Sequence, residues 1–352
     1  MAKTKQDRIK TVYGGGGHVV ILGAGASIAS TFRNPEPNGK RLPSMDNFID
    51  IVELSDIVEI LPERLRAKNF EQLYTNLHNE NPNSDEIIEI QNRVYNYFKD
   101  MKLPENEATI YDFLVLSLRP RDLIATFNWD PFLYQAFCRN APIADMPYVC
   151  FLHGSVSIGY SKEDGRSGPV GMQMRRDGGL FEPTQLLYPV SQKNYTADEF
   201  INMEWSKVKK WLHEDSTKRV TIFGYGAPDT DVEAVSLMNT AWGTADKRNM
   251  EQFEIIDIRS EEEGVKRWES FIHSHHYDYT NNYFSSSLAS NPRRTFESYF
   301  QHNMPETPSD AFSASNPITA DIKTLQELWE WHKPLVEAEN EWKEEQKKKN
   351  GK

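Results

Sequence analysis

The chain has 352 residues, 38% of them hydrophobic, and a formal net charge of −12. This length suffices for one large domain or two of ordinary size, and the negative balance argues against general nucleic-acid binding, which needs a basic surface. Two cysteines, Cys138 and Cys150, are too few for a zinc ribbon or a disulfide framework. Because no signal peptide or long apolar run is present, we expect a cytoplasmic protein without a membrane segment.

Residues 1–16 end in a run of glycines and are expected to form a flexible N-terminal segment. Residues 17–27 then read as a buried strand that runs into a glycine turn, with an unbroken apolar run at 19–22. A glycine turn that opens a helix points backbone N–H groups at an anion. A plain strand-to-helix turn is the alternative, because Ile28 stands where the full dinucleotide fingerprint has Gly or Ala.

A loop at 31–43 follows, at a place where a flap over a ligand can lie. Helical patterns then succeed one another without a strand, at 44–61, 70–80, 84–101 and 110–118. This stretch is too long for a simple crossover between strands. We therefore expect an inserted helical lobe at about residues 44–118.

Strand and helix patterns alternate beyond the lobe. Strands are expected at 123–127, 148–152, 220–223 and 253–258, helices at 197–213, 229–242 and 260–273, and a mobile loop at 157–182. This alternation predicts an α/β fold with a Rossmann-like, doubly wound parallel sheet, in which ligands bind at the carboxyl ends of the strands. A linker at 303–318 and a charged C-terminal helix at 319–352 complete the chain, the helix docking on the surface or contacting another subunit.

Polar residues stand at the ends of the second and third strands. Asn128 and Asp130 follow one strand, where they can cap the next helix or face a ligand. His153 follows the other strand and precedes Gly154. A single histidine is more often structural, but its ordinary pKa of about 6.5 suits a general base at this edge of the sheet.

The fourth and fifth strands end in similar features. Gly224 and Gly226 repeat the glycine turn, and Asp229 and Asp231 behind them can cap the helix that follows. Asp257 ends the fifth strand, where an acid can accept from a ribose hydroxyl or form a salt bridge at the sheet edge.

In this order, residues 23–27 (Gly-Ala-Gly-Ala-Ser), 126–130 (Thr-Phe-Asn-Trp-Asp), 152–154 (Leu-His-Gly) and 224–231 resemble the sirtuin-like NAD-binding family, most of all its bacterial anti-phage branch. The likeness spans about residues 17–260. It implies a Rossmann-type domain at 17–302 that cleaves NAD⁺, as its substrate, to nicotinamide and ADP-ribose, and so depletes the cofactor after infection.

The resemblance also implies roles for single residues. Asn128 orients the nicotinamide ribose or its water, His153 is the catalytic base, and Asp130 belongs to the polar shell around the ribose. Cofactor binding falls to Gly23, Ala24, Gly25, Ser27, Gly224, Tyr225, Gly226 and Asp257, with Gly23, Ala24 and Ser27 on the pyrophosphate side and Asp257 or its neighbours on the adenosine ribose.

The chain departs from the protein-deacylating sirtuins. Their zinc module needs four cysteines, and residues 31–33 (Thr-Phe-Arg) stand in place of their Gly-Ile-Pro-Asp-Phe-Arg run. This weakens the deacylase interpretation, and a non-catalytic module that senses NAD⁺ or ADP-ribose is the other alternative. No metal is expected, and His273, His275 and His276 are interpreted as a surface helix end.

The resemblance implies partners as well. We expect a homo-oligomer that a separate activator switches on, such as a HerA-like DNA-translocating ATPase or a prokaryotic Argonaute, with no membrane contact and no specific nucleic-acid binding of its own.

Overall fold

The computed structural model describes residues 3–172, 175–190, 193–228, 231–248, 250–273, 277–303 and 307–350. A six-stranded sheet in the order β3-β2-β1-β7-β8-β9 forms its centre, and every neighbouring pair runs parallel. The strands are β1 (Gly17–Leu22), β2 (Leu123–Thr126), β3 (Tyr148–Phe151), β7 (Thr217–Phe223), β8 (Gln252–Ile256) and β9 (Tyr277–Thr280). The predicted α/β class with a doubly wound parallel sheet is confirmed.

The direction of strand addition reverses beside β1. From β1 the chain adds β2 and β3 on one side, then returns to the other side of β1 with β7 and continues to β8 and β9. In sheets of this kind, ligands bind in the crevice beyond the carboxyl ends of the strands at the reversal point. The fold therefore places the crevice between the ends of β1 and β7.

Both faces of the sheet are covered, which explains the unbroken apolar run of β1. Val20 and Leu22 pack into one hydrophobic core, and Val19 and Ile21 into the other, because successive side chains of a strand point to opposite faces. Helices α2 (Ala24–Ser30), α7 (Ile110–Ser117), α8 (Phe132–Asn140) and α13 (Ser287–Ser290) contribute to the first core, and α9 (Glu199–His213) and α10 (Val232–Trp242) to the second.

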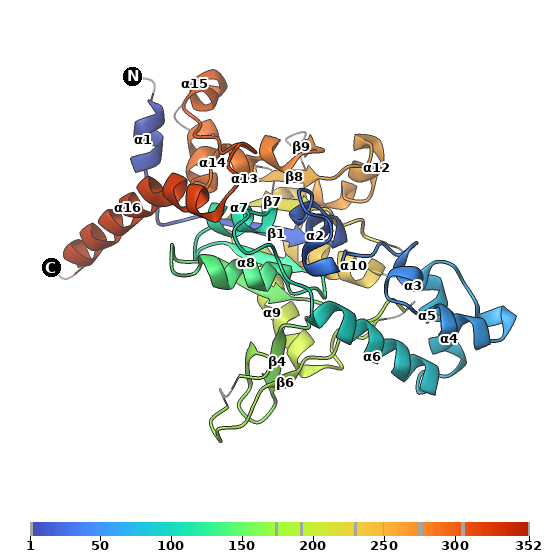
Figure 1. The fold of residues 1–352 in the computed structure, drawn as a ribbon. Coiled ribbons are helices and arrows are strands. Elements are labelled where there is room, and N and C mark those ends of the chain that lie inside the picture. Colours follow the sequence, from blue (N-terminus) through green and yellow to red (C-terminus); the bar gives the residue numbers. More distant parts are fainter. Residues whose placement is uncertain are drawn as a thin grey trace.

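The helical lobe extends to one side of the sheet (Figure 1). Its helices are α3 (Phe48–Ile51), α4 (Ser55–Ile60), α5 (Phe70–Glu80) and α6 (Asp85–Lys99), with 3-10 turns η1 (Pro37–Gly39) and η2 (Glu63–Leu65). The prediction of one continuous helix at 44–61 is wrong, because the chain breaks at Glu53, whose φ is 59°. Helix α7, which was expected in the lobe, instead packs beside α8 on the sheet.

The prediction of a mobile loop at 157–182 is also wrong for its described residues. Strands β4 (Ile158–Ser161), β5 (Arg166–Pro169) and β6 (Glu182–Pro183) form a small antiparallel sheet in the order β5-β4-β6. The glycines that suggested a loop make room for the buried Phe181, since a Cβ on Gly168 would lie 2.5 Å from its ring and a Cβ on Gly159 would lie 2.7 Å from its Cβ.

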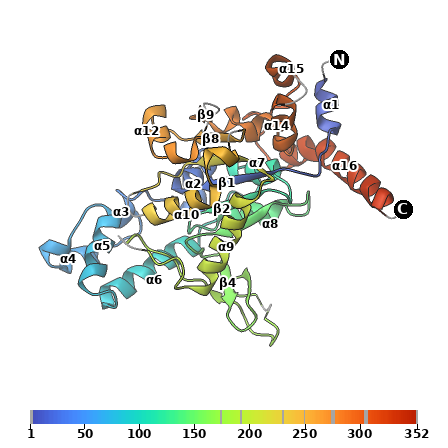
Figure 2. The same cartoon turned by 180° about the vertical axis from the view of Figure 1, so that it is seen from behind.

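Short elements complete the C-terminal half. They are α11 (Ala245–Arg248), α12 (Glu261–Lys266), η4 (Glu269–Phe271), η5 (Tyr283–Ser285), α14 (Thr295–Asn303), α15 (Pro308–Ser313) and α16 (Leu325–Asn350). Helix α15 lies within the predicted linker, and α1 (Lys5–Lys10) lies within the segment predicted to be flexible. Helix α16 buries Leu325, Leu328 and Leu335 against the domain, and α1 lies beside it (Figure 2).

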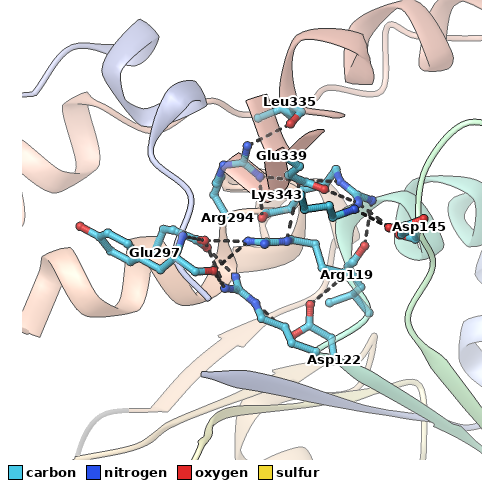
Figure 3. A network of polar contacts seen from close by, with 12 residues as sticks. Arg119, Asp122, Asp145, Arg294, Glu297, Leu335, Glu339 and Lys343 are labelled. Atoms are coloured by element: carbon cyan, nitrogen blue, oxygen red, sulfur yellow. Dashed lines mark hydrogen bonds and ion pairs between the residues drawn. The ribbon is translucent and has the colours of Figure 1, made fainter. Parts of the chain in front are cut away.

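A buried ionic network fixes these terminal elements to the sheet (Figure 3). Arg119 and Arg121 reach Glu297 of α14 at 2.8 and 2.5 Å. Glu339 of α16 pairs with Arg293 and Arg294 at 2.7 and 2.6 Å. Burial alone would raise the pKa of Glu339, but these guanidinium groups outweigh burial and lower it to about 2.

In the part of the chain that the structure describes, no helix combines the length and the apolar composition that crossing a bilayer requires.

Candidate functional site

Two glycine turns meet at the point where the strand order reverses. The N–H of Gly25 donates to the carbonyl oxygen of Gly224 at 2.9 Å, and a Cβ on Gly23 would lie 2.5 Å from the Cα of Tyr225. Gly224 has a φ of +60°, in the left-handed region that favours glycine. The glycines are therefore required because the two turns pack backbone against backbone. This packing is a reason for glycine that is separate from phosphate binding.

A cavity of about 220 Å³ opens beside these turns, at the carboxyl ends of β1, β2 and β7. Of the predicted site residues, it is lined by Gly23, Ala24, Ser27, Asn128, Asp130, His153, Gly224, Tyr225 and Gly226, and not by Gly25 or Asp257. The structure thus brings the three predicted catalytic side chains to one cavity, from two separate segments of the sequence, one after β2 and one after β3.

The helical lobe supplies the apolar wall of this cavity. Leu42 and Pro43 come from the predicted flap, and Met45, Phe48 and Phe98 come from the lobe itself. The insertion between β1 and β2 therefore closes one side of the cavity opposite the strand ends.

Asn128 belongs to a buried hydrogen-bond network. Its amide nitrogen donates to the carbonyl oxygen of Gly23 at 2.8 Å, to Ser27 Oγ at 2.8 Å and to the hydroxyl of Tyr111 at 3.1 Å. No donor from the described residues reaches its amide oxygen, so that oxygen is free to act as an acceptor in the cavity. The sequence analysis missed Tyr111, because the apolar pattern of α7 marked it only as a core residue.

Asp130 lines the cavity and also bonds the backbone at the start of α8, while its role toward a ligand stays a prediction. One carboxylate oxygen accepts from the backbone N–H of Phe132 at the start of α8, at 3.1 Å, and the other accepts from Ser27 Oγ at 2.6 Å. Burial raises the pKa of Asp130 to about 6, although both hydrogen bonds act against the increase. Asp130 therefore changes charge close to neutral pH.

His153 lines the cavity but is largely buried. Its Nε2 lies 3.3 Å from the hydroxyl of Tyr195 and 3.9 Å from a carboxylate oxygen of Asp231, and the ring of Phe127 packs edge-on against it. Burial, with the nearby charge of Lys193, lowers the pKa of His153 to about 3, against a smaller opposing effect of Asp231. The imidazole is therefore neutral at physiological pH.

Asp231 faces His153 instead of capping a helix. It stands at the start of α10, but its side chain makes no capping hydrogen bond there. Its carboxylate pairs with the buried ammonium group of Lys193 and accepts from the hydroxyl of Tyr225 at 2.8 Å. The capping interpretation of Asp231 is thus wrong, and Asp229 lies outside the described residues. Lys193 was missed because it lies in an irregular segment with no motif.

Asp257 lies at the end of β8, outside the cavity lining. Its carboxylate accepts from the backbone N–H and from the Nε and Nη2 of Arg259, at 3.0, 3.0 and 2.6 Å. The same guanidinium lies near Gly226, since a Cβ there would be 3.4 Å from its Nη1. The role of Asp257 on a ribose stays a prediction.

The histidine group near residue 273 is only partly described. His273 Nε2 lies 2.9 Å from the carbonyl oxygen of Gly243, while His275 and His276 lie outside the described residues. Where residues are described, no three His, Cys, Asp or Glu side chains are placed to hold a metal ion.

No protein-family model and no curated protein matches the chain. It is similar to solved structures of Sir2 homologues. A triple mutant with 2′-O-acetyl ADP-ribose is 13% identical, with a TM-score of 0.38 over 76% of this chain and 94% of that one. A Sir2 homologue in complex with NAD is 12% identical, with a TM-score of 0.31 over 76% of this chain and 91% of that one. Sir2 bound to an acetylated peptide is 11% identical, with a TM-score of 0.30 over 74% of this chain and 86% of that one. TM-scores below 0.5 do not establish common ancestry, so the site assignment depends on the geometry above.

Proposed function

We propose that the chain binds NAD⁺ in the cavity between the ends of β1 and β7 and hydrolyses it to nicotinamide and ADP-ribose. The observation that carries the proposal is the convergence of His153, Asn128 and Asp130 on one cavity beside two packed glycine turns. The resemblance of the same motifs to the sirtuin-like family points to the same substrate.

The shape of the cavity suggests how NAD⁺ lies. Pockets that enclose a drug-sized ligand have volumes of about 300–1,000 Å³, and this one has about 220 Å³. The enclosed part therefore takes one end of the dinucleotide, the nicotinamide riboside, against the apolar wall of the lobe. The pyrophosphate lies along the turns at Gly23 and Gly226, and the adenosine extends toward Asp257.

The proposed reaction breaks the bond between the anomeric carbon of the ribose and the nicotinamide nitrogen. The electron pair leaves with nicotinamide, and the ribose passes through an oxocarbenium-like state, as in other glycosidic cleavages. Water forms the new bond to that carbon, and His153 takes its proton as general base. The amide oxygen of Asn128 orients the water or a ribose hydroxyl, and the carboxylate of Asp130 stabilises the developing positive charge.

We also propose the role that the resemblance implies: depletion of NAD⁺ in a bacterial anti-phage response, by a homo-oligomer that a separate partner activates. A HerA-like ATPase or a prokaryotic Argonaute is the expected kind of activator. The resemblance alone supports this part of the proposal.

The test is to incubate purified protein with NAD⁺, with and without the product of the neighbouring gene, and to measure nicotinamide and ADP-ribose by chromatography. Release of both products without any peptide supports the proposal. Release only when an acetylated peptide is added identifies a deacylase, and tight NAD⁺ binding with no release under any condition identifies a sensing module. Either of these results overturns the proposal.

A further inference from the structure

A buried polar cluster that the reaction scheme above does not use lies beside His153, and two of its members, Lys193 and Asp231, line the same cavity. It consists of Lys193 and Tyr195, from the segment before α9, and Asp231, from the start of α10. All three side chains are buried. Because burying charged groups is costly unless they are paired, a cluster of this kind beside a reacting group requires an explanation.

The cluster contacts only one of the two ring nitrogens of His153. Tyr195 and Asp231 both face Nε2, at 3.3 and 3.9 Å. Within the described ranges, no side chain or backbone group forms a hydrogen bond with Nδ1. The two nitrogens of an imidazole point in diverging directions, so Nδ1 is directed away from Tyr195 and Asp231.

The carboxylate of Asp231 is fixed from two sides. Lys193 pairs with one of its oxygens, and the hydroxyl of Tyr225 donates to the other at 2.8 Å. Lys193 keeps the cluster near charge neutrality, which makes a buried carboxylate beside His153 tolerable. Asp231 is therefore a fixed acceptor on the Nε2 side of the ring.

An acceptor on one side of a histidine determines which nitrogen carries the proton. The hydroxyl of Tyr195 hydrogen-bonds to the carboxylate of Asp231, which can only accept, so the hydroxyl oxygen is left to accept from Nε2. With this oxygen and the carboxylate of Asp231 near Nε2, the neutral ring places its hydrogen there, and the lone pair is on Nδ1. When Nδ1 then takes a proton, the ring becomes positively charged, and the negative charge of Asp231 stabilises it.

We propose that Asp231, held by Lys193, is a positioning residue that keeps His153 in its Nε2–H tautomer, so that Nδ1 is the nitrogen that accepts the proton from the attacking water. The catalytic consequence depends on the proposed function. The tautomer does not depend on it.

The test combines a spectroscopic measurement with kinetics. The protein is labelled with ¹⁵N-histidine, and the ring nitrogens of His153 are assigned by comparison with His153→Gln. The expected wild-type spectrum is that of the Nε2–H tautomer. In Asp231→Asn, we expect a mixture of tautomers and a kcat for nicotinamide release lowered about 10- to 100-fold, with KM changed less than about threefold. Asp231→Glu, which keeps the carboxylate, should retain part of the preference for the Nε2–H tautomer and part of kcat.

Asp56→Asn is the matched control, because it makes the same chemical change in a surface ion pair of the lobe with Arg93. It should change neither the spectrum nor kcat. Tyr195→Phe provides a second test on the Nε2 side of the ring if Asp231→Asn does not fold, and it should also produce a mixture of tautomers.

The possible failures are distinguishable. An Nδ1–H tautomer in the wild type, or an unchanged tautomer in folded Asp231→Asn and Tyr195→Phe, overturns the positioning role. A loss that appears only in KM also overturns it, because Asp231 would then act in binding. A wild type that releases no nicotinamide under any condition contradicts the proposed function, while the spectra still decide the tautomer.

Discussion

Gly25 and Gly224 touch backbone to backbone, with a hydrogen bond of 2.9 Å, and a Cβ on Gly25 would lie 2.8 Å from the Cα of Gly224. Gly25→Ala must therefore push apart the two turns that frame the crevice. We expect a loss of about 1–3 kcal/mol in the free energy of unfolding, as for other overpacked sites, and weaker NAD⁺ binding. Urea unfolding and calorimetric titration measure the two effects.

Gly15→Ala is the control for that prediction, because among the described residues no atom lies within 4 Å of a Cβ built there. It should leave both quantities unchanged. A Gly25→Ala protein as stable as the wild type would show that the turns can separate without cost.

The second prediction concerns the reacting groups. His153→Ala should lower the rate of nicotinamide release by about 10² to 10⁴ and leave NAD⁺ binding largely intact, because the proposed phosphate contacts lie at the glycine turns. Asn128→Ala should lower the same rate about 100-fold, because the reacting groups lose their orientation. The rate of the double variant should fall by far less than the product of the two separate losses, because both residues act on one step. His213→Ala, on the exposed end of α9, is the matched control. Folded His153→Ala with the parent rate would eliminate the base mechanism.

The third prediction assigns the acid limb of the pH–rate profile to Asp130. Its pKa is raised to about 6, so it loses its negative charge as the pH falls below 6. His153, with a pKa of about 3, stays neutral over the same range. We expect kcat/KM of the wild type to decrease as the pH is lowered below about 6. In Asp130→Asn, kcat/KM should be lower overall and should not show this decrease. An acid limb that persists unchanged in that variant would assign it to another group.

The fourth prediction concerns nucleotide choice. In the proposed binding mode the adenosine ribose lies near Asp257, whose carboxylate would repel a 2′-phosphate, so we expect the protein to prefer NAD⁺ to NADP⁺. Removing that carboxylate releases the guanidinium of Arg259, which it now binds. Asp257→Ala should therefore weaken NAD⁺ binding and narrow the difference between the two nucleotides. Equal cleavage rates in the wild type, or unchanged affinity in the variant, would exclude this role.

The fifth prediction concerns stability against pH. Burial lowers the pKa of His332 to about 3, and that of His18 falls well below its ordinary value. An unfolded chain binds protons on these rings below pH 6.5, whereas the folded protein does not. The contribution of each ring to the free energy of unfolding is complete above pH 6.5 and decreases as the pH falls, by up to about 1.4 kcal/mol per pH unit. For His332 this loss continues until about pH 3. Urea midpoints between pH 7.5 and 5.5 measure this slope, which should be shallower in His332→Leu.

The strands that carry the cavity could be predicted because they are covered on both faces. The short, unbroken apolar runs of β1, β2 and β7 are typical of strands that lie in the centre of a parallel sheet. The edge strand β9 could not, since it is only partly buried and contains Asp278. Strands β4 to β6 were also missed, because their glycines accommodate one buried aromatic ring and hide the alternation expected of a strand.

The cavity was predicted in part for a similar physical reason. Asn128 and His153 directly follow strands, so their positions at the sheet edge can be read from the sequence. Lys193 and Tyr195 lie in an irregular segment whose path is set by packing on the sheet, and no local pattern marks them. Tyr111 reaches the network from a helix that reads only as core.

The ionic network around Glu297 and Glu339 has a consequence for how the chain assembles. Arg119 precedes its partner Glu297 by 178 residues, and the carboxylate that binds Arg293 comes 46 residues after it. Until those partners are synthesised, burying these guanidinium groups would leave them uncompensated. Contacts between such distant segments slow folding, because a long loop must lose conformational entropy on closing before the contacts that stabilise it can form. We therefore expect the sheet to mature late, after α14 and α16 have been synthesised, and chains shortened before α16 to be substrates for chaperones and proteases.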